Sequence, residues 1–529
     1  MSFRVITYIL QELAMPKHVA FHPLRKLLNS GNPNRVTRNP SVTPPLEEYF
    51  KQHHVDYAAF LAYQASLTSE VVTPFSDRYQ QARAESDNAF DKYPLFVVYC
   101  TNVADVLASI QFAQAQSLQV CGRAGGHSTA GYSVLNGRIV IDVSLINSVF
   151  VDPQHKIATV GAGVTWGEFN HVLNAYGLHT PGGSCSSVGV TGYTLGGGYG
   201  YTSMRWGIAC DHLIEVTLVT ADGKIVTANE EQHPELLWAH RGGTGGNFGI
   251  VVALKYRLEE LSLVWPIEIN WPIEDAAKVL TLWQNQMTKT LEDTKLGLLG
   301  FLATKQRTVV QPDGEQVIYN DPYFCIRGIY SGEDAAAGAK ALAPLLAVGT
   351  TSFPTGSLWQ KQVPYAQANE HLLDNVEGVI PDAIKETKRC AYVERALSEA
   401  EYQQIVDYFK TSPNLYNIVS MEPYGGAINA VRPEATAFVH RNAYFDIFVD
   451  SFWMEEKEKP AAFSWLHDYF ESPAMQPLWS EFYYQNYPNS EYKNWQHGYF
   501  GINYPKLQQI KRQWDPHNFF QYEQSIEPA

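Results

Sequence analysis

Two glycine-rich stretches decide the fold of this chain: VCGRAGGHS, from Val120 to Ser128, and PGGSCSSVG, from Pro181 to Gly189. Glycine clusters of this kind occur where the backbone passes close to a ligand or adopts positive φ. Backbone N–H groups in such loops form nests that bind a pyrophosphate without a Lys or Arg. Each stretch carries one nucleophilic side chain, His127 in the first and Cys185 in the second. We therefore expect both side chains to lie beside a ligand rather than in a hydrophobic core.

Four further motifs follow in order along the chain. They are GGGYG at 196–200, RGGTGGNFG at 241–249, YFGIN at 499–503, and a tail from Asp515-Pro-His-Asn-Phe-Phe to Gln524-Ser-Ile526. With the two glycine-rich stretches, they resemble the berberine-bridge-enzyme-like branch of the vanillyl-alcohol-oxidase flavoprotein superfamily. The resemblance is strong over residues 90–260 and 480–527 and loose between them.

The resemblance implies an FAD cofactor held by two covalent bonds. In this branch the histidine is bonded to the flavin 8α-methyl group and the cysteine to flavin C6, which implies bicovalent attachment at His127 and Cys185. A glycine-rich turn with free N–H groups also favours the reactive thiolate of Cys185. The other residues expected at the cofactor are Arg123, Ala124, Gly125, Gly126, Ser128, Gly183, Val188, Gly189, Gly192, Gly197, Gly198, Gly200, Gly249, Ile250, Tyr499 and Asn503.

Some of these residues also have a purely structural interpretation. An isolated histidine is usually hydrogen-bonded within the fold, and a buried cysteine behaves as a small hydrophobe. Arg123 is either an anchor on the phosphate side of the cofactor or an ordinary salt-bridge partner, and the sequence leaves both open. Gly161-Ala-Gly163 resembles the start of a dinucleotide fingerprint, but Trp166 stands where the third glycine belongs. We expect a helix at 166–176 that packs on a sheet there instead.

The fold class that follows is α+β, with a PCMH-type FAD-binding domain and a substrate domain of antiparallel sheet covered by helices. The predicted organisation is an N-terminal extension at 1–45, the FAD-binding domain at 46–260, the substrate domain at 261–470, and a C-terminal return to the FAD-binding domain at 471–529. Apolar runs predict strands at 96–101, 118–121, 138–143, 157–160, 214–220, 224–228, 248–258, 296–303, 323–330 and 443–452. Helical spacing predicts helices at 103–113, 276–287, 335–343 and 398–409, the first capped by Asn102, and Ala221-Asp-Gly223 predicts a hairpin turn.

Tyr484 is the candidate for the catalytic base. In relatives of this branch, a Tyr followed two places later by Asn, just before the Tyr-x-Gly-x-Asn motif, faces the flavin and takes a proton; Tyr484 and Asn486 match this pattern. The alternative is simple packing, because the chain has 31 tyrosines and Tyr483 and Tyr487 lie close by. A free phenol has a pKa of about 10, so a base near neutral pH needs a cation or hydrogen-bond donors at the phenolate.

Asp446 is the second catalytic candidate, because some relatives carry an acidic residue there on a central strand that faces the flavin. Strand alternation predicts Tyr444, Asp446 and Phe448 on one face. An acid between bulky apolar residues is costly to bury without a role or a partner. The alternative is a solvated or salt-bridged acid, with Arg441 as the candidate partner.

Two positions near Cys185 bear on how the flavin is reoxidised. Many relatives carry His where this chain has Tyr193, so the handling of substrate or oxygen differs there. Val188 is a small residue near the position where relatives admit dioxygen to the flavin. This favours an oxidase over a dehydrogenase.

The composition limits the kinds of partner and bound metal that we expect. The 529 residues carry a net charge of −15, which argues against nucleic acid and against an anionic membrane surface. The six cysteines show no CxxC spacing or His-rich pairing, so we expect no metal site and no disulfide framework. No run of apolar residues is long enough for a membrane helix. The short apolar patch from Val5 to Leu10 has no clear cleavage site after it, which favours a cytoplasmic over a secreted protein and leaves the compartment open.

The favoured function is an FAD-dependent oxidase that takes a hydride from an alcohol carbon, with O2 as electron acceptor and H2O2 as product. Because the stretch from Asn486 to Gly501 resembles hexose and oligosaccharide oxidases, and aromatic residues make up 13% of the chain, a carbohydrate oxidised at its anomeric hydroxyl to a lactone is the expected substrate. Two alternatives stay open. One is oxidation or ring closure of an alkaloid, polyketide or other secondary metabolite; the other is a flavin-binding protein without turnover.

Overall fold

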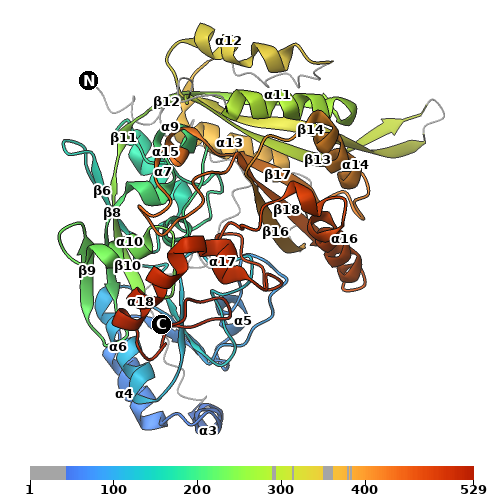
Figure 1. The fold of residues 1–529 in the computed structure, drawn as a ribbon. Helices are drawn as coiled ribbons and strands as arrows, with labels where there is room; N and C mark the ends of the chain where they lie inside the picture. The colour runs from blue at the N-terminus through green and yellow to red at the C-terminus, as the bar shows by residue number, and fades with distance from the viewer. Residues whose placement is uncertain (1–42, 289–293, 312–314, 350–360, 378–380, 382–383) are drawn as a thin grey trace, which may run out of the picture. The chain divides into compact units, whose positions relative to one another are not determined.

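The computed structural model describes residues 43–288, 294–311, 315–349, 361–377, 381 and 384–529. These residues form a mixed α+β fold built around three larger sheets, as predicted (Figure 1). Most of the expected N-terminal extension, residues 1–42, lies outside the described residues. Among the residues that the structure describes, no helix is both long enough and apolar enough to cross a membrane.

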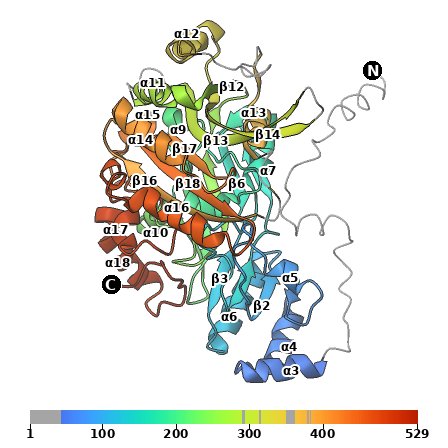
Figure 2. The same ribbon diagram turned by 90° about the vertical axis from the view of Figure 1, so that its right-hand side faces the viewer.

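The first sheet has four strands in the order β1-β2-β4-β3. The strands are β1 (Glu70–Val72), β2 (Phe96–Tyr99), β3 (Val120–Arg123) and β4 (Ile139–Asp142), and β2, β4 and β3 run parallel. Helix α6 (Val103–Ala115) begins after Asn102, whose side chain accepts from the Asp105 N–H at 3.0 Å and so confirms the predicted cap. Figure 2 shows β2 and β3 beside α6, with α3 (Thr43–Gln52) and α4 (Tyr57–Ser66) nearby; α5 is Tyr79–Ala82.

The second sheet has five antiparallel strands in the order β5-β6-β10-β8-β9. Strands β8 and β9 form the hairpin predicted from Ala221-Asp-Gly223, and α7 confirms the helix predicted after Thr165. The bounds in this region are β5 (Val149–Asp152), β6 (Ile157–Gly161), α7 (Trp166–Ala175), β7 (Leu178–His179), α8 (Val190–Leu195), α9 (Ser203–Trp206), η2 (Ala209–His212), β8 (Leu213–Val219), β9 (Ile225–Asn229), α10 (Pro234–His240), β10 (Ile250–Arg257) and β11 (Glu259–Glu260).

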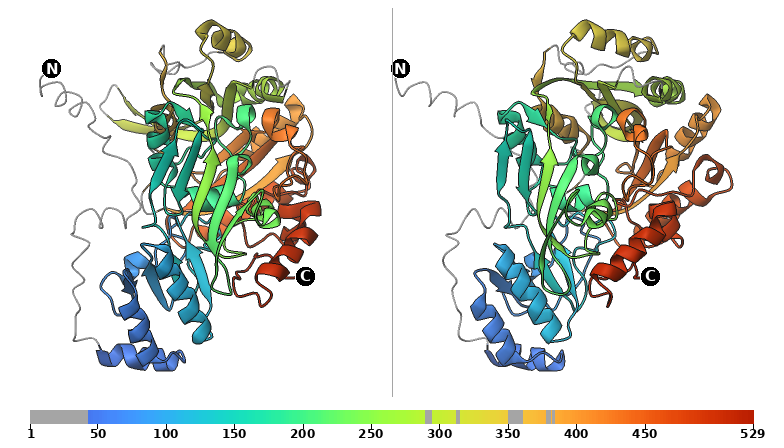
Figure 3. Two further views of the ribbon diagram at one scale, coloured as in Figure 1. Left: turned by 90° about the vertical axis from the view of Figure 1, so that its left-hand side faces the viewer. Right: turned by 60° about the vertical axis from the view of Figure 1, so that its left-hand side comes forward.

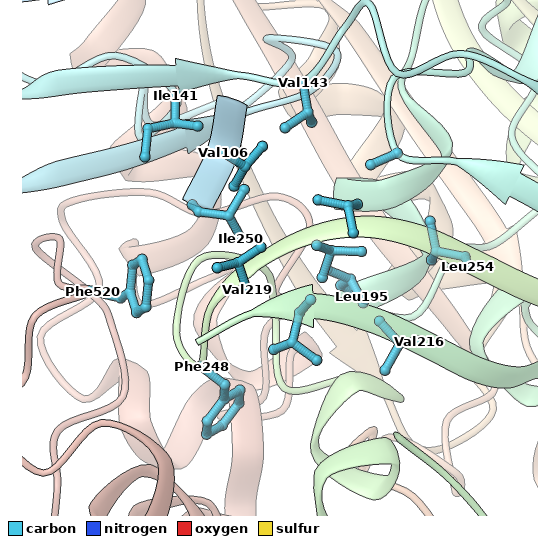
Figure 4. Packing of buried hydrophobic residues seen from close by; sticks show 14 of the residues in the cluster. Val106, Ile141, Val143, Leu195, Val216, Val219, Phe248, Ile250, Leu254 and Phe520 are labelled. Atoms are coloured by element: carbon cyan, nitrogen blue, oxygen red, sulfur yellow. The ribbon is translucent and has the colours of Figure 1, made fainter. Parts of the chain in front are cut away.

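One hydrophobic core joins these two sheets to the end of the chain. Figure 4 shows Val106 of α6, Ile141 of β4, Val216 of β8 and Ile250 of β10 packed together, with Phe520 from the C-terminal tail beside them. The tail follows α17 (Trp495–Phe500), η6 (Gly501–Asn503) and α18 (Tyr504–Trp514). The C-terminal segment therefore packs on the FAD-binding half, as the resemblance implied.

The third sheet has seven antiparallel strands in the order β15-β12-β14-β13-β17-β18-β16. Figure 3 shows the helices Ala276–Thr288, Glu399–Phe409 and Lys459–Glu471 on the side facing away from the five-stranded sheet. The helix Tyr365–Glu377 packs on the opposite face, where Asn369 donates to the Ser184 carbonyl at 2.9 Å. The bounds are β12 (Leu263–Pro272), η3 (Ile273–Asp275), α11 (Ala276–Thr288), β13 (Leu296–Val310), β14 (Gln316–Tyr330), α12 (Ala335–Leu346), β15 (Val363–Pro364), α13 (Tyr365–Glu377), β16 (Lys385–Val393), α14 (Glu399–Phe409), β17 (Ile418–Pro423), α15 (Gly426–Ala430), β18 (Phe445–Trp453), α16 (Lys459–Glu471) and η5 (Gln476–Leu478).

The two faces of this sheet differ in chemistry. On β17 and β18, Val419, Met421, Ile447 and Val449 point to the helix-covered face and are fully buried in an apolar core. The residues that alternate with them along the strands, including Glu422 and Asp446, point to the opposite face, toward the FAD-binding half. Alternation along a strand sends neighbouring side chains to opposite faces. We call the second one the polar face.

Two sequence predictions about this sheet need correction. Tyr444 precedes β18 and packs with the helix-covered core, whereas Phe448 packs on the polar face, so the expected common face of Tyr444, Asp446 and Phe448 is wrong for Tyr444. The backbone N–H of Tyr444 bonds Val393 O at 2.7 Å outside the regular ladder, which removes it from the alternation. The hairpin of β13 and β14 is also longer than predicted, because its pairing continues past Ala303 through exposed polar residues.

Candidate functional site

The two glycine-rich loops meet at their backbones. A Cβ on Gly189 would lie 2.8 Å from the Gly125 nitrogen, and a Cβ on Gly125 would overlap Gly189. Ser187 lies between the two nucleophiles: its Oγ is 3.0 Å from Nε2 of His127 and 3.4 Å from Sγ of Cys185. The structure therefore brings the two predicted attachment residues to one hydroxyl. Cys185 is also half-buried, whereas the other cysteines are buried.

The run at 196–200 lies between these loops and the C-terminal segment. Gly197 and Gly198 have φ of 126° and 91°, which side chains rarely adopt. In this conformation the N–H of Gly198 donates to the Tyr484 hydroxyl at 2.8 Å. A Cβ on Gly196 would overlap the Asn486 side chain. Close contacts at Gly196, Gly197 and Gly198 leave no room for a side chain, which explains the three consecutive glycines.

Two hydrogen-bond donors hold the phenol oxygen of Tyr484. Its Oη accepts from the N–H of Gly198 at 2.8 Å and from Nδ2 of Asn486 at 2.9 Å. The same Asn486 nitrogen donates to the Tyr193 carbonyl at 2.8 Å, so one amide positions two tyrosines and gives the Tyr-x-Asn spacing a physical reason. The side chain is buried. Burial raises the pKa of Tyr484 well above 10, and the two donors act in the opposite direction.

Asp446 is fully buried on the polar face, opposite Glu422 on the neighbouring strand. Neither carboxylate oxygen of Asp446 has a hydrogen-bond partner within the described residues, and the same holds for Oε2 of Glu422. Burial, followed by the charge of Glu422, raises the pKa of Asp446 well above its usual value. Burial likewise raises the pKa of Glu422 to about 8. Arg441 pairs with Asp211 at 2.6 Å, so the salt bridge considered for Asp446 is wrong.

Sequence reasoning missed Glu422. Its Oε1 accepts from the Tyr487 hydroxyl at 3.3 Å, which connects it to the segment that carries Tyr484. The signal in the sequence was an acidic residue at the end of an otherwise apolar run, directly before Pro423-Tyr-Gly-Gly426. Its partnership with Asp446 depends on strand register, which periodicity alone does not reveal.

Lys388 lies on the polar face, and its positive charge acts on these acids. Its Nζ lies 2.7 Å from Asp450 and 3.4 Å from Glu386, and 4.9 Å from the centre of the Tyr487 ring. The charge of Lys388 lowers the pKa of both Glu422 and Asp446 but does not offset their burial. Three buried acids, Glu422, Asp446 and Asp450, therefore share one ammonium group.

Arg123 is engaged within the fold. Its guanidinium forms a buried ion pair with Asp142 and donates to Ala82 O at 2.6 Å and to the Tyr99 hydroxyl at 3.2 Å. Of the two roles left open by the sequence, the structure contains the salt bridge. A contact between Arg123 and the cofactor stays a prediction.

The remaining predicted cofactor residues fall into two groups. The first group belongs to the glycine-rich stretches or directly follows them: Ala124, Gly126, Ser128, Gly183, Val188, Gly192, Gly200, Gly249 and Ile250. Gly192 is exposed, and a Cβ there would meet no atom within 4 Å. Tyr499 and Asn503 instead hold the chain together: the Tyr499 hydroxyl donates to Gln524 at 2.9 Å, and Asn503 donates to three carbonyl groups between 433 and 437. Flavin contacts of these residues stay predictions.

Comparison with known proteins agrees with this geometry. The family described as "FAD binding domain" matches residues 94–229, and the family "Berberine and berberine like" matches residues 483–527. The FAD-linked oxidoreductase YgaK of Bacillus subtilis is 31% identical over 469 residues, which cover 88% of this chain and 98% of that protein. Aclacinomycin-N/aclacinomycin-A oxidase of Streptomyces galilaeus is 27% identical and covers 85% of this chain and 88% of its own length.

Solved structures show the same fold. BBE-like 1 of Physcomitrella patens superimposes with a TM-score of 0.74 at 24% identity, covering 89% of this chain and 99% of its own. Chitooligosaccharide oxidase superimposes with a TM-score of 0.74 at 23% identity, covering 89% of this chain and 100% of its own. This chain belongs to the berberine-bridge-enzyme-like family of FAD-linked oxidoreductases.

Proposed function

We propose that this protein is an oxidase that oxidises the anomeric hydroxyl of a carbohydrate to a lactone, with O2 as electron acceptor and H2O2 as product. The observation that carries the proposal is the Tyr484 oxygen, which two donors hold between the glycine run and the polar face of the sheet. The family supplies the oxidoreductase class, and the proposal adds the substrate, the acceptor and the roles of residues.

The glycine-rich loops fit an FAD cofactor. Backbone contact between Gly125 and Gly189 leaves no room for a Cβ, and His127 and Cys185 converge on Ser187. We propose that His127 and Cys185 each carry one covalent bond to the flavin. FAD supplies the two-electron acceptor that takes the hydride from the substrate carbon and passes the electrons to O2. Acid-denatured protein is then expected to stay yellow, and each single Ala variant to keep its flavin; free flavin in the supernatant contradicts the attachment.

Tyr484 takes the proton of the substrate hydroxyl in this scheme. Loss of the hydroxyl proton and of the carbon-bound hydride converts the C–OH group to C=O, and Tyr484 accepts the proton in its phenolate form, which must therefore be stabilised. Donors aimed at a phenol oxygen stabilise its charged form. Gly198 and Asn486 provide two such donors, which counteract the effect of burial on the pKa of Tyr484. Both donors are held by backbone geometry or by a second hydrogen bond, so they are in place before substrate arrives.

Unsatisfied polar atoms support a polyhydroxylated substrate. The hydroxyls of Tyr193 and Tyr199, both oxygens of Asp446 and Oε2 of Glu422 are buried without a hydrogen-bond partner within the described residues. Leaving a buried polar group unpaired costs about 1–3 kcal/mol. A sugar presents several hydroxyl groups that satisfy such atoms, and the rings of Tyr199 and Tyr424, stacked with centroids 5.6 Å apart, offer an aromatic surface.

A screen of mono- and oligosaccharides with H2O2 detection tests the substrate. Turnover of one sugar class by the parent protein, and its loss in Tyr484→Phe, supports the proposal. No H2O2 from any sugar, together with turnover of a phenolic or amine compound, selects the secondary-metabolite alternative. Failure of the dithionite-reduced flavin to regain its colour quickly in air selects a binding protein without oxidase activity.

A further inference from the structure

We propose that Glu422 and Asp446 form one proton-sharing pair, in which Glu422 is a positioning residue that keeps Asp446 protonated as a hydrogen-bond donor to the substrate. The role of Asp446 toward the substrate rests on the proposed function, whereas the existence of the carboxyl pair does not depend on it. It gives Asp446 a role different from that of a base and assigns a role to Glu422.

Strand register places the two carboxyls together. Glu422 on β17 and Asp446 on β18 are direct partners in an antiparallel ladder, and both belong to the polar face. Side chains directly opposite each other in such a ladder have Cβ atoms about 4.5–5.5 Å apart. Both residues are buried, at 6% and 0% exposure, so bulk water screens their charges little.

Two carboxylates so close in a buried site do not ionise together. Like charges at short range disfavour the second ionisation, and burial disfavours both. The pair therefore keeps at least one proton at neutral pH and titrates as a unit rather than as two independent groups. The direction of both pKa shifts agrees with this geometry.

The surroundings assign the proton to Asp446. Glu422 accepts a hydrogen bond from the Tyr487 hydroxyl at 3.3 Å, which favours its charged form. Asp446 has no such donor within the described residues. A protonated Asp446 has an O–H to donate and can hold a substrate oxygen while Tyr484 takes the proton of the reacting hydroxyl. The division resembles other carboxyl pairs in which different environments separate acid and base roles.

Other titratable groups facing the pair do not replace this proton. Lys388, the ammonium group whose charge acts on the pair among the described residues, already pairs with Asp450 at 2.7 Å. Burial raises the pKa of Cys390 and of Tyr193, Tyr199, Tyr392, Tyr424 and Tyr487, so these groups stay neutral near pH 7. At Tyr484, hydrogen bonds from Gly198 and Asn486 oppose the effect of burial on the pKa, as its proposed role as base requires. The groups are Lys388, Glu386, Asp450, Cys390, Tyr392, Tyr424, Tyr193, Tyr199, Tyr484 and Tyr487.

The test compares Glu422→Gln, Asp446→Asn and the double variant in the flavin-loaded protein. Without a carboxylate at position 422, Asp446 ionises at lower pH, and the alkaline limb of the kcat/KM profile is expected to move down by about one pH unit. Asp446→Asn keeps a donor that cannot ionise, so the double variant is expected to share the limb of Asp446→Asn. Glu422→Asp keeps the carboxyl and is expected to restore the parent limb.

The matched control is Glu386→Gln. Glu386 is an acid of β16 that lies near Lys388 but is not the cross-strand partner of Asp446. It is expected to leave the limb in place. A folded Glu422→Gln variant with the parent limb overturns the proposal.

A second readout needs no substrate and separates failure of the pair from failure of the proposed function. Native carboxyls with raised pKa bind protons that the unfolded chain has lost, so stability falls as pH rises from about 5 to about 8. Glu422→Gln and Asp446→Asn are each expected to reduce this fall, and their effects are expected to be non-additive. Additive effects overturn the pair even if a sugar is turned over, and non-additive effects support it even if none is.

Discussion

The two faces of the seven-stranded sheet use the same strands for different purposes. Met421 and Glu422 are neighbours on β17, yet Met421 lies in the helix-covered core and Glu422 lies among buried acids and tyrosines. The same division separates Ile447 from Asp446 on β18. One face is lined mainly by apolar side chains and stabilises the fold, whereas the other buries polar atoms, several of them without a hydrogen-bond partner among the described residues, at a cost in free energy. A shift of one residue in register would exchange these roles, which is why the register must be firmly specified.

The largest expected effect comes from a residue that faces the polar face. Tyr484→Phe removes only the hydroxyl and keeps the ring, so kcat is expected to fall by about 10²–10⁴-fold if the phenol is the base. Flavin content and melting temperature are expected to change little, because no apolar contact is lost. Stopped-flow reduction of the flavin by substrate measures the effect. Reduction at a rate near that of the parent would place the base elsewhere, with Asp446 as the next residue to examine.

The next effect tests the helix-covered face. Met421→Ala removes a fully buried side chain from the apolar core and is expected to lower the free energy of unfolding by about 2–5 kcal/mol. Denaturant unfolding measures this loss. Since Met421 points away from the polar face, kcat of the folded fraction is expected to stay close to the parent value. A large fall in kcat without a loss of stability would contradict the division between the faces.

The pH dependence of stability sharpens the comparison. Glu422 and Asp450 have pKa values raised to about 8 by burial, so the folded state holds protons that the unfolded state releases above about pH 4. The contribution of these two groups to stability is therefore greatest below about pH 4 and is expected to decrease from there up to about pH 8, since the unfolded state binds fewer protons over that range. One pKa unit corresponds to about 1.4 kcal/mol, so a decrease of a few kcal/mol is expected. Thermal unfolding across this pH range checks the sign.

The smallest expected effect concerns a polar group on the helix-covered face. The Ser451 hydroxyl donates to Ala462 O at 3.0 Å between β18 and α16. Ser451→Ala is expected to cost about 1 kcal/mol of stability. The kcat/KM profile is expected to remain that of the parent at every pH, because the group does not face the buried acids. A shifted profile would show that the two faces are coupled.

The sequence predicted what short motifs encode. The Asn102 cap and the pair of Tyr484 with Asn486 depend on neighbours within a few residues, and the structure shows both hydrogen bonds. The motifs also singled out His127 and Cys185, which the structure brings to Ser187, while their bonds to a flavin stay predictions. Strands β13, β14 and β18 were found from their apolar runs.

What the sequence did not reveal depends on long-range pairing. Strand β16 starts with Lys385-Glu-Thr-Lys-Arg389 and has no apolar run there, yet it pairs with β18 along its whole length. Glu422 acquires its meaning only from the register that sets it opposite Asp446. Arg441 finds Asp211 far away in the sequence rather than Asp446 close by. Such partners are selected by tertiary packing, which overrides local preference.

The single amide of Asn486 has a consequence for the order in which the protein is made. Its nitrogen donates to the Tyr484 hydroxyl and to the carbonyl of Tyr193, which lies 293 residues earlier in the chain. The ribosome adds about 5–20 residues per second and lets earlier domains fold first, so the glycine loops are made before Tyr484 and Asn486. If Tyr484 is the base, as we propose, substrate oxidation cannot begin until this later segment has joined the loops.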